Sequence, residues 1–325
     1  MALAWTELLL LLALVGWAGR RLVLQAEALA DRGGWSRGWL GLFALGVVTS
    51  LPELVTGVSA VTLADAPDLA AGDALGSCVL NLALLGAALM ARPGPMARPD
   101  ALAAHRVAAM ATLVGLGAVT VAIVGARLGV AGRIGPVGWA SVVLAVGYAW
   151  VVRGTVPRSA ATPSARGPEL RRALWAWALT AAVVAAAGLR LPLAGTRLAG
   201  LMGWSDSFVG TLLVALATSM PELASTAAAL RVGAIDLAWG NLLGSNLFDL
   251  LVLAVDDLAY AGGPIYASVS GVHLSTLLAA ALGTALALGA LRPASSPTVA
   301  RVTGAWLMGL FALNAYVVYL LGVRA

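Results

Sequence analysis

Long apolar runs, separated by short clusters of charge, glycine and proline, constrain this chain more than any other feature. Breaks at those clusters divide it into ten apolar segments, roughly 4–29, 38–63, 68–90, 102–126, 130–152, 170–196, 206–230, 235–258, 265–290 and 299–322. A helix of about 20 apolar residues crosses a bilayer, and only helices and closed barrels satisfy the backbone there. Barrel strands alternate apolar and polar residues, which these runs do not. The sequence therefore predicts an all-α integral membrane protein with ten transmembrane helices.

The composition agrees with a chain embedded in the lipid bilayer. The residues are 61% hydrophobic and 11% charged, whereas soluble domains are about a quarter charged. All twenty basic residues are arginine, which excludes a lysine Schiff base, and the single Cys78 excludes an internal disulfide. We interpret the net charge of +5 as loop arginines and not as a nucleic-acid surface. The N-terminal run carries Glu7 and no positive charge at its start, so we interpret it as a retained first span and not as a signal peptide.

The distribution of arginine predicts the orientation. With Arg20 and Arg21 left aside, thirteen arginines fall on one side of a ten-span chain and five on the other, the five being Arg127, Arg133, Arg190, Arg197 and Arg324. Cytoplasmic loops carry the excess of arginine. We therefore expect a multi-pass protein of the plasma (inner) membrane with both termini extracytoplasmic.

The two halves of the chain repeat each other. "TSLPEL" at 49–54 matches "TSMPEL" at 218–223, and "AGDALGSCVLNL" at 71–82 matches "WGNLLGSNLFDL" at 239–250. We expect a first five-helix repeat over 1–155, a cytoplasmic linker over 156–169 and a second five-helix repeat over 170–325. Because five is odd, the second repeat enters the membrane inverted, which is how many secondary transporters are built.

A proline and a glutamate interrupt the second and seventh spans. Pro52 and Pro221 lack an N–H and open the helix before them, so helices 2 and 7 are predicted to be discontinuous. Carbonyls freed in this way need water, a neighbouring helix or a cation as partner. Thr49, Ser50 and Glu53, like Thr218, Ser219 and Glu222, add side-chain oxygens at the same place.

The following span in each half supplies further oxygen atoms. Ser77 and Asn81 are four residues apart, as are Ser245 and Asp249, so each pair lies on one helical face. Glycines spaced four apart on these spans allow close approach of the broken helix: Gly72, Gly76, Gly240 and Gly244. Oxygen donors without His or Cys suit Ca²⁺ or Na⁺. A proline kink is often only a kink, but acids within a membrane are functional by default.

These motifs resemble the two alpha-repeats of the cation/calcium antiporter superfamily, in its sodium/calcium exchanger branch, over 46–82 and 215–250. The resemblance implies that Na⁺ and Ca²⁺ are bound in turn by ten side chains and by the carbonyls of two residues before the breaks. Carried to this sequence, the set is Gly46, Thr49, Ser50, Glu53, Ser77, Asn81, Ala215, Thr218, Ser219, Glu222, Ser245 and Asp249. It also implies sodium coupling, since the proton-coupled branch usually has a glutamate where Asn81 and Asp249 stand. Sliding of spans 1 and 6 across a fixed core is implied by the same resemblance.

Asp73 departs from the family pattern, which has asparagine there. We expect it to cap a helix end or face water, while a fourth carboxylate near the site would keep proton-coupled exchange open. Asp256 and Asp257, with Asp65 and Asp68, are expected in solvated loops. His105 and His273 are expected to be structural.

The sequence thus predicts an antiporter that exchanges Na⁺ for Ca²⁺ by alternating access, functional as a single chain and without a cofactor. Proton-coupled cation exchange is the alternative. An intramembrane enzyme would need a nucleophile or a His/Cys metal set, which is missing, and a channel would not need two inverted halves.

Overall fold

The computed structural model describes residues 1–33, 46–92, 99–130, 132–155, 168–231, 233, 235–291 and 296–323. The start of the predicted second span (38–45) and most of the predicted linker lie outside these residues. The first half contains helices α1 (Ala2–Gly33), α3 (Gly46–Thr49), α4 (Leu51–Leu63), α5 (Pro67–Ala91), α6 (Pro99–Arg127) and α7 (Trp139–Thr155). The second contains α8 (Pro168–Met202), α9 (Asp206–Phe208), the π-helix η2 (Val209–Val214), α10 (Ala215–Thr218), α11 (Met220–Arg231), α12 (Ile235–Ala259), α13 (Ile265–Ser268), α14 (His273–Ala290) and α15 (Pro297–Val323).

Six described helices are long and apolar enough to cross a membrane, or seven if the bent pair formed by Asp206–Thr218 and Met220–Arg231 is one span. Two shorter apolar helices cover Leu51–Leu63 and Trp139–Gly154. The 25-residue α12 carries four aspartates, Asp236, Asp249, Asp256 and Asp257, which lower its hydropathy. Every predicted span therefore contains helix where it is described, and the chain is a multi-pass membrane protein. The arrangement as ten spans in two inverted repeats remains a prediction.

The fifth predicted span begins later than expected. We predicted 130–152, but a two-stranded antiparallel hairpin, β1 (Arg133–Ile134) and β2 (Val137–Gly138), precedes α7, with Arg133 opposite Gly138. Gly135 lies at its turn with φ of +62°, a left-handed conformation that favours glycine. Sequence patterns cannot separate such short strands from the start of an apolar helix.

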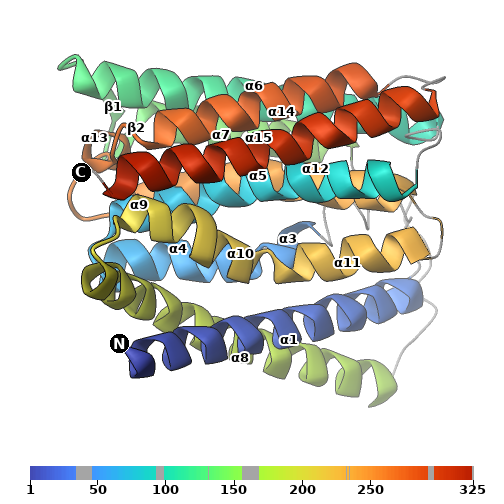
Figure 1. The fold of residues 1–325 in the computed structure, drawn as a ribbon. Helices are drawn as coiled ribbons and strands as arrows, with labels where there is room; N and C mark the ends of the chain where they lie inside the picture. The colour runs from blue at the N-terminus through green and yellow to red at the C-terminus, as the bar shows by residue number, and fades with distance from the viewer. Residues whose placement is uncertain are drawn as a thin grey trace.

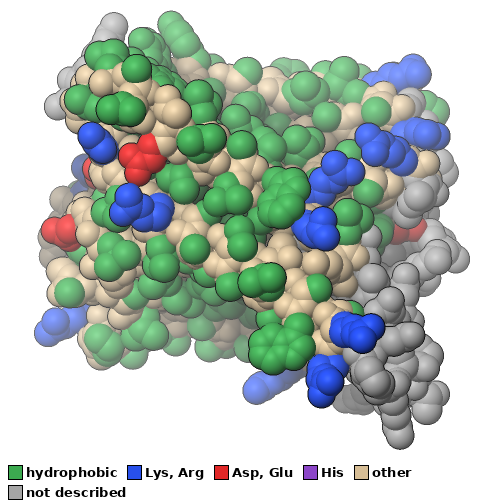
Figure 2. Space-filling model, turned by 90° about the horizontal axis from the view of Figure 1, so that it is seen from below, with side chains coloured by type: hydrophobic (Ala, Val, Ile, Leu, Met, Phe, Trp, Pro, Cys, Tyr) green, Lys and Arg blue, Asp and Glu red, His purple; other side chains and the backbone are tan. Residues whose placement is uncertain are grey.

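The helices lie roughly side by side in layers (Figure 1). Helices α1 and α8 pair at one face, α6, α14 and α15 cover the opposite face, and α5 and α12 lie between them (Figure 1). Both chain ends lie at the same end of the bundle (Figure 1). Hydrophobic side chains cover much of the face that α1 and α8 form (Figure 2), as expected of a surface in contact with lipid.

Glycine allows α5 to touch the second broken helix backbone to backbone. A Cβ on Gly72 would stand 2.9 Å from the Thr211 nitrogen, and a Cβ on Gly76 would overlap the Thr211 backbone. The close approach predicted from these two glycines is confirmed. Because no side chain separates the two helices, residues farther along α5 are held against the break between α10 and α11.

Candidate ion-binding site

Each Pro-Glu motif interrupts its helix at the serine two residues before the proline. Ser50, with φ of −89° and ψ of 15°, separates α3 from α4, and Ser219, with φ of −83° and ψ of 11°, separates α10 from α11. The second pair is bent by 45°. Proline gives no N–H to the carbonyl four residues earlier, so the two predicted breaks in the helices are present. The π-helix before the second break was not predicted.

The two breaks contact each other reciprocally. The Ser50 hydroxyl donates to Glu222 Oε1 at 3.1 Å, and the Ser219 hydroxyl donates to Glu53 Oε1 at 3.2 Å. Ser50 and Ser219 are equivalent positions of the two motifs, and so are the two glutamates. Each motif thus supplies the hydroxyl that binds the carboxylate of the other, as residues do across a two-fold axis.

Helices α5 and α12 supply the neighbouring oxygens. The Ser245 hydroxyl donates to Glu222 Oε1 at 3.1 Å and lies 3.2 Å from Thr49 Oγ1. On the other side, Ser219 Oγ, which donates its proton to Glu53, lies 3.1 Å from Ser77 Oγ. These contacts form two buried networks, each of which joins both breaks, one to α12 and the other to α5.

Helices α5 and α12 also contact each other about one helical turn beyond Ser77 and Ser245, through residues at equivalent positions of the two repeats. Asn81 Nδ2 donates to Asp249 Oδ2 at 3.4 Å, and Asn246 Nδ2 donates to the Cys78 carbonyl at 3.2 Å. Both contacts join residues at matching positions of the two repeats. Together, the contacts of the breaks and of α5 and α12 involve nine of the ten predicted side-chain ligands, and the tenth, Thr218, precedes Ser219 in the chain.

Several oxygens at this centre, where the two breaks, α5 and α12 meet, are buried and have no hydrogen-bond partner among the described residues. They are Glu53 Oε2, Glu222 Oε2, Asp249 Oδ1, Asn81 Oδ1 and Asp73 Oδ2, on side chains no more than 1% exposed. A buried charge without a partner costs several kcal/mol, so such a carboxylate takes up a proton or a cation. Within the described ranges, no three His, Cys, Asp or Glu side chains could hold a metal ion by themselves. A cation here would therefore also use hydroxyl, amide or carbonyl oxygens.

Asp73 does not face water, contrary to our expectation. Its side chain is 1% exposed, and its Oδ1 accepts a hydrogen bond of 2.9 Å from Thr218 Oγ1. The helix α5 begins six residues earlier, at Pro67, so Asp73 lies within the helix and not at its end. Asp73 thus adds a fourth carboxyl group beside one of the predicted ligands.

The two predicted carbonyl ligands are placed differently. The Ala215 carbonyl accepts a hydrogen bond from Ser219 N at 3.0 Å and lies 3.3 Å from Thr218 Oγ1, whose single proton is donated to Asp73. A carbonyl oxygen has two lone pairs, so one is left for a cation. Gly46 is the first residue of α3, on the helical turn before Ser50.

Asp256, Asp257 and Asp68 are not loop acids, which corrects the expectation of solvated side chains. Asp256 and Asp257 are no more than 1% exposed. Asp68 Oδ1 accepts from Ser270 N at 2.6 Å and lies 3.0 Å from His273 Nε2. The surroundings of these three acids were missed because they depend on where α13, α14 and the hairpin fold back, which no local pattern reveals. His273 has a structural partner, as we expected.

The fold and the site define a multi-pass helical membrane protein in which two broken helices meet at a buried centre lined by oxygen. Comparisons with known proteins identify its family. The family described as Sodium/calcium exchanger protein matches this chain twice, over residues 3–156 and 170–322. The chain therefore belongs to the sodium/calcium exchanger family, and it is a cation/Ca²⁺ antiporter by class.

Three relatives match this chain over different lengths, from almost the whole chain to about a fifth of it. A putative antiporter, CaxA, of Alkalimonas amylolytica is 28% identical over 318 residues, which cover 95% of this chain and 96% of the relative. The inner membrane protein YrbG of Escherichia coli is 29% identical and covers 80% of this chain and 84% of its own. The sodium/calcium exchanger MaX1 of Methanosarcina acetivorans is 44% identical over 63 residues, which are 19% of this chain and 18% of its own.

Solved structures share the fold. One structure of the sodium-calcium exchanger NCX_Mj matches with a TM-score of 0.67 at 24% identity and covers 96% of this chain and 97% of its own. Another structure of the same exchanger matches with a TM-score of 0.63 at 26% identity and the same coverage.

Proposed function

We propose that this chain exchanges Na⁺ for Ca²⁺ by alternating access through one central site formed by both repeats. The observation that carries the proposal is the reciprocal pair of bonds, Ser50 to Glu222 and Ser219 to Glu53, beside carboxylate oxygens that have no partner within the described ranges. Reciprocal contacts are expected if the five-helix halves, 1–155 and 170–325, are inverted copies related by a two-fold axis in the membrane. The ligands are the ten side chains predicted above, with the carbonyls of Gly46 and Ala215 as additional donors.

The charge of the site sets the ion count. Glu53, Glu222 and Asp249 carry three negative charges when ionised, which three Na⁺ neutralise. One Ca²⁺ leaves a single negative charge, which favours uptake of a proton by Asp249 because an uncompensated buried charge is costly. Several Na⁺ and one Ca²⁺ therefore exclude each other, and Asp73 is taken as neutral in this count.

Proton-coupled exchange is the second candidate, and the burial of Asp73 favours it. Asp73 accepts a hydrogen bond from Thr218 Oγ1 and keeps one oxygen without a partner. If Asp73 took up a proton when Ca²⁺ left and released it when Ca²⁺ bound, protons would take the place of Na⁺ as the driving ion. Asparagine at the equivalent position, Asn241, cannot do this.

The two candidates separate in sealed vesicles that contain the purified chain. An outward Na⁺ gradient is expected to drive ⁴⁵Ca²⁺ uptake, and a pH gradient alone is expected to drive none. The Asp73→Asn variant is expected to keep the Na⁺-driven uptake. Uptake driven by the pH gradient in the unmodified chain, and lost in Asp73→Asn, would establish proton coupling and overturn the sodium proposal.

The proposed topology places both termini outside the cytoplasm, in agreement with their position at one end of the bundle (Figure 1). A single chain contains both halves of the site, so we propose that a monomer is sufficient for transport. The ions are substrates, and no cofactor enters the proposed cycle.

A further inference from the structure

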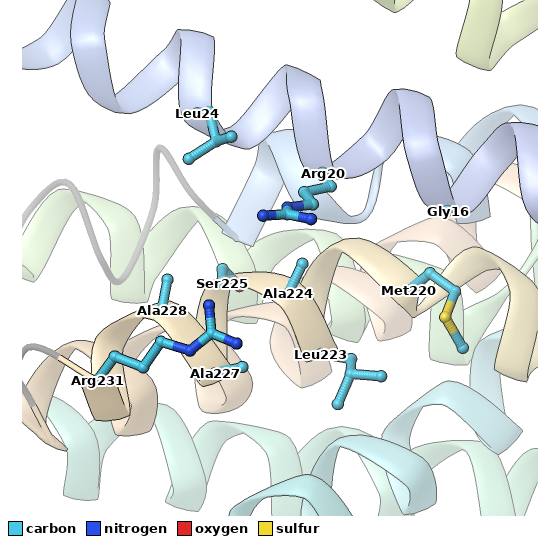
Figure 3. A pocket seen from close by; sticks show the side chains of 10 residues that line it. All are labelled: Gly16, Arg20, Leu24, Met220, Leu223, Ala224, Ser225, Ala227, Ala228 and Arg231. Carbon is cyan, nitrogen blue, oxygen red and sulfur yellow. The ribbon is translucent and has the colours of Figure 1, made fainter.

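A groove of about 300 Å³ lies between α1 and α11, and two arginines line it. In Figure 3 the Arg20 side chain descends from α1 and the Arg231 side chain rises from the end of α11, so that both guanidinium groups face the same space. Ser225, Ala224 and Ala228 lie between them (Figure 3). Two like charges that share one groove repel each other unless an anion lies between them.

No acidic side chain in the described part of the chain neutralises this pair. The groove is lined by arginine, serine, methionine, glycine and aliphatic residues only. Arg20 and Arg231 are exposed and form no ion pair or hydrogen bond with the part of the chain that the structure describes. Arg190 and Arg197, by contrast, approach Glu7 at 3.5 and 3.6 Å. The groove therefore has an excess of positive charge that the described protein does not balance.

The depth of the groove is set by contacts of α1 with the second break. A Cβ on Gly16 would stand 3.2 Å from Met220 Cγ, and a Cβ on Gly19 would overlap the Pro221 ring. Arg20 is the next residue, so its Cα lies near the depth of the break and its long side chain extends toward the end of α11. An arginine at this depth extends its side chain so that the guanidinium group reaches the membrane interface.

The remaining walls of the groove are apolar and open to the side. Leu24 is 51% exposed and Leu223 is 42% exposed, and Ala227 and Ala228 continue the same wall. Hydrophobic side chains cover this face of the molecule, with arginines gathered toward its ends (Figure 2). An occupant must therefore combine a negative head with an apolar body.

We propose that this groove binds the phosphate head group of an anionic phospholipid, with one acyl chain against Leu24 and Leu223. Guanidinium groups bind phosphate oxygens in a bidentate manner, and basic pockets between membrane helices bind anionic head groups on the cytoplasmic side. Arg231 is the last residue of α11, at the end of that helix that we predict to be cytoplasmic. The bound lipid contacts both α1 and α11, the helix that carries Glu222, next to the contacts of Gly16 and Gly19 with α11. Lipid binding does not depend on which ions are exchanged.

Native mass spectrometry of the delipidated, detergent-purified full chain tests this proposal, with phosphatidylglycerol and phosphatidylcholine titrated separately. The chain is expected to bind phosphatidylglycerol in preference to phosphatidylcholine. The double variant Arg20→Gln/Arg231→Gln is expected to weaken phosphatidylglycerol binding about 30-fold, because each arginine near an anionic lipid contributes roughly fivefold. Arg21→Gln is the matched control: Arg21 is the next residue on α1, lies over the Trp17 ring at 5.9 Å and does not line the groove.

Three results would overturn the proposal. The first is equal binding of the two lipids, and the second is an equal loss in Arg21→Gln and in the double variant. The third is displacement of phosphatidylglycerol by millimolar inorganic phosphate, which would assign the groove to a free anion. Circular dichroism of each variant shows whether it folds. If the double variant does not fold, the single variants Arg20→Gln and Arg231→Gln are tested instead, and each is expected to weaken phosphatidylglycerol binding by roughly fivefold.

Discussion

Asp257 is a buried acid whose two carboxylate oxygens both accept hydrogen bonds from other parts of the fold. Its Oδ2 accepts hydrogen bonds from Gly138 N at 2.7 Å and Ser141 Oγ at 2.6 Å, and its Oδ1 accepts one from Ile265 N at 2.6 Å. One carboxylate thereby joins the hairpin, α7 and α13 to the end of α12. Asp256, the preceding residue, has no hydrogen bond at either oxygen within the described chain.

Asp257→Asn is expected to destabilise the fold. Whichever way the amide is turned, its NH₂ group faces an N–H donor, so a buried bond is lost and a donor stays unsatisfied, at a cost of about 2 kcal/mol. Thermal unfolding in detergent measures the effect. Asp65→Asn is the control, because Asp65 is exposed with φ of 49°, a conformation that asparagine tolerates. Equal midpoints for both variants would contradict the structural role of Asp257.

Asp249→Asn tests the ion count at the level of one residue. With two carboxylates left at the site, two Na⁺ balance one Ca²⁺, so two Na⁺ are expected to move for each Ca²⁺. In the unmodified chain three Na⁺ are expected to move for each Ca²⁺, because Asp249 carries a proton when Ca²⁺ is bound and none when Na⁺ is bound. The ratio of ²²Na⁺ flux to ⁴⁵Ca²⁺ flux in sealed vesicles measures this difference. A ratio of three in Asp249→Asn would refute the count.

At the residue scale, repeated chemistry could be predicted and single acids could not. Ser50, Ser219 and the two glutamates were recognisable because they occur twice in the same order, and the structure brings them together. Asp73, Asp256 and Asp257 have no equivalent acid in the other half. Their environment depends on helices that pack against them from far along the chain, which local sequence does not specify.

At the element scale, a break in a helix can be predicted from residue type, whereas a π-helical segment cannot. Pro52 and Pro221 each remove a backbone donor, and both breaks are where that loss predicts them. The π-helix Val209–Val214 consists of residues common in α-helices, and no residue type marks it. It lies where Gly72 and Gly76 of α5 meet the backbone of Thr211. The π-helix occurs where this segment packs against α5, and such a contact between distant segments cannot be predicted from the local sequence.

Gly19→Ala is expected to disrupt the contact between α1 and the second break. The added Cβ would overlap the Pro221 ring, which is rigid and cannot rotate away. We expect a loss of about 1–3 kcal/mol from overpacking and slower Na⁺-driven ⁴⁵Ca²⁺ uptake. Gly117→Ala on α6 is the matched control, since a Cβ there meets no atom within 4 Å. An uptake rate in Gly19→Ala equal to that of Gly117→Ala would show that the close approach is unimportant for transport.

At the scale of the whole molecule, the two halves meet at matching positions. Asn81 contacts Asp249 and Cys78 contacts Asn246, in addition to the reciprocal serine and glutamate bonds. If these contacts reflect a two-fold axis, both repeats contribute to one shared ion-binding centre. Two independent repeats would instead have formed two separate centres. The helical membrane fold was predictable because apolar runs of this length have few other stable structures. The short hairpin before α7 was not, because it consists of two strands of two residues each.

Equilibrium binding of ⁴⁵Ca²⁺ to the purified chain tests the shared centre most directly. One Ca²⁺ per chain is expected, displaced cooperatively by Na⁺. Changing a partner of a metal ligand already costs roughly 10- to 100-fold in affinity. Glu53→Gln and Glu222→Gln, which remove proposed ligands, are therefore each expected to weaken binding by about 100-fold or more. Two Ca²⁺ per chain, or full binding retained when either glutamate is replaced, would contradict a single site formed by both repeats.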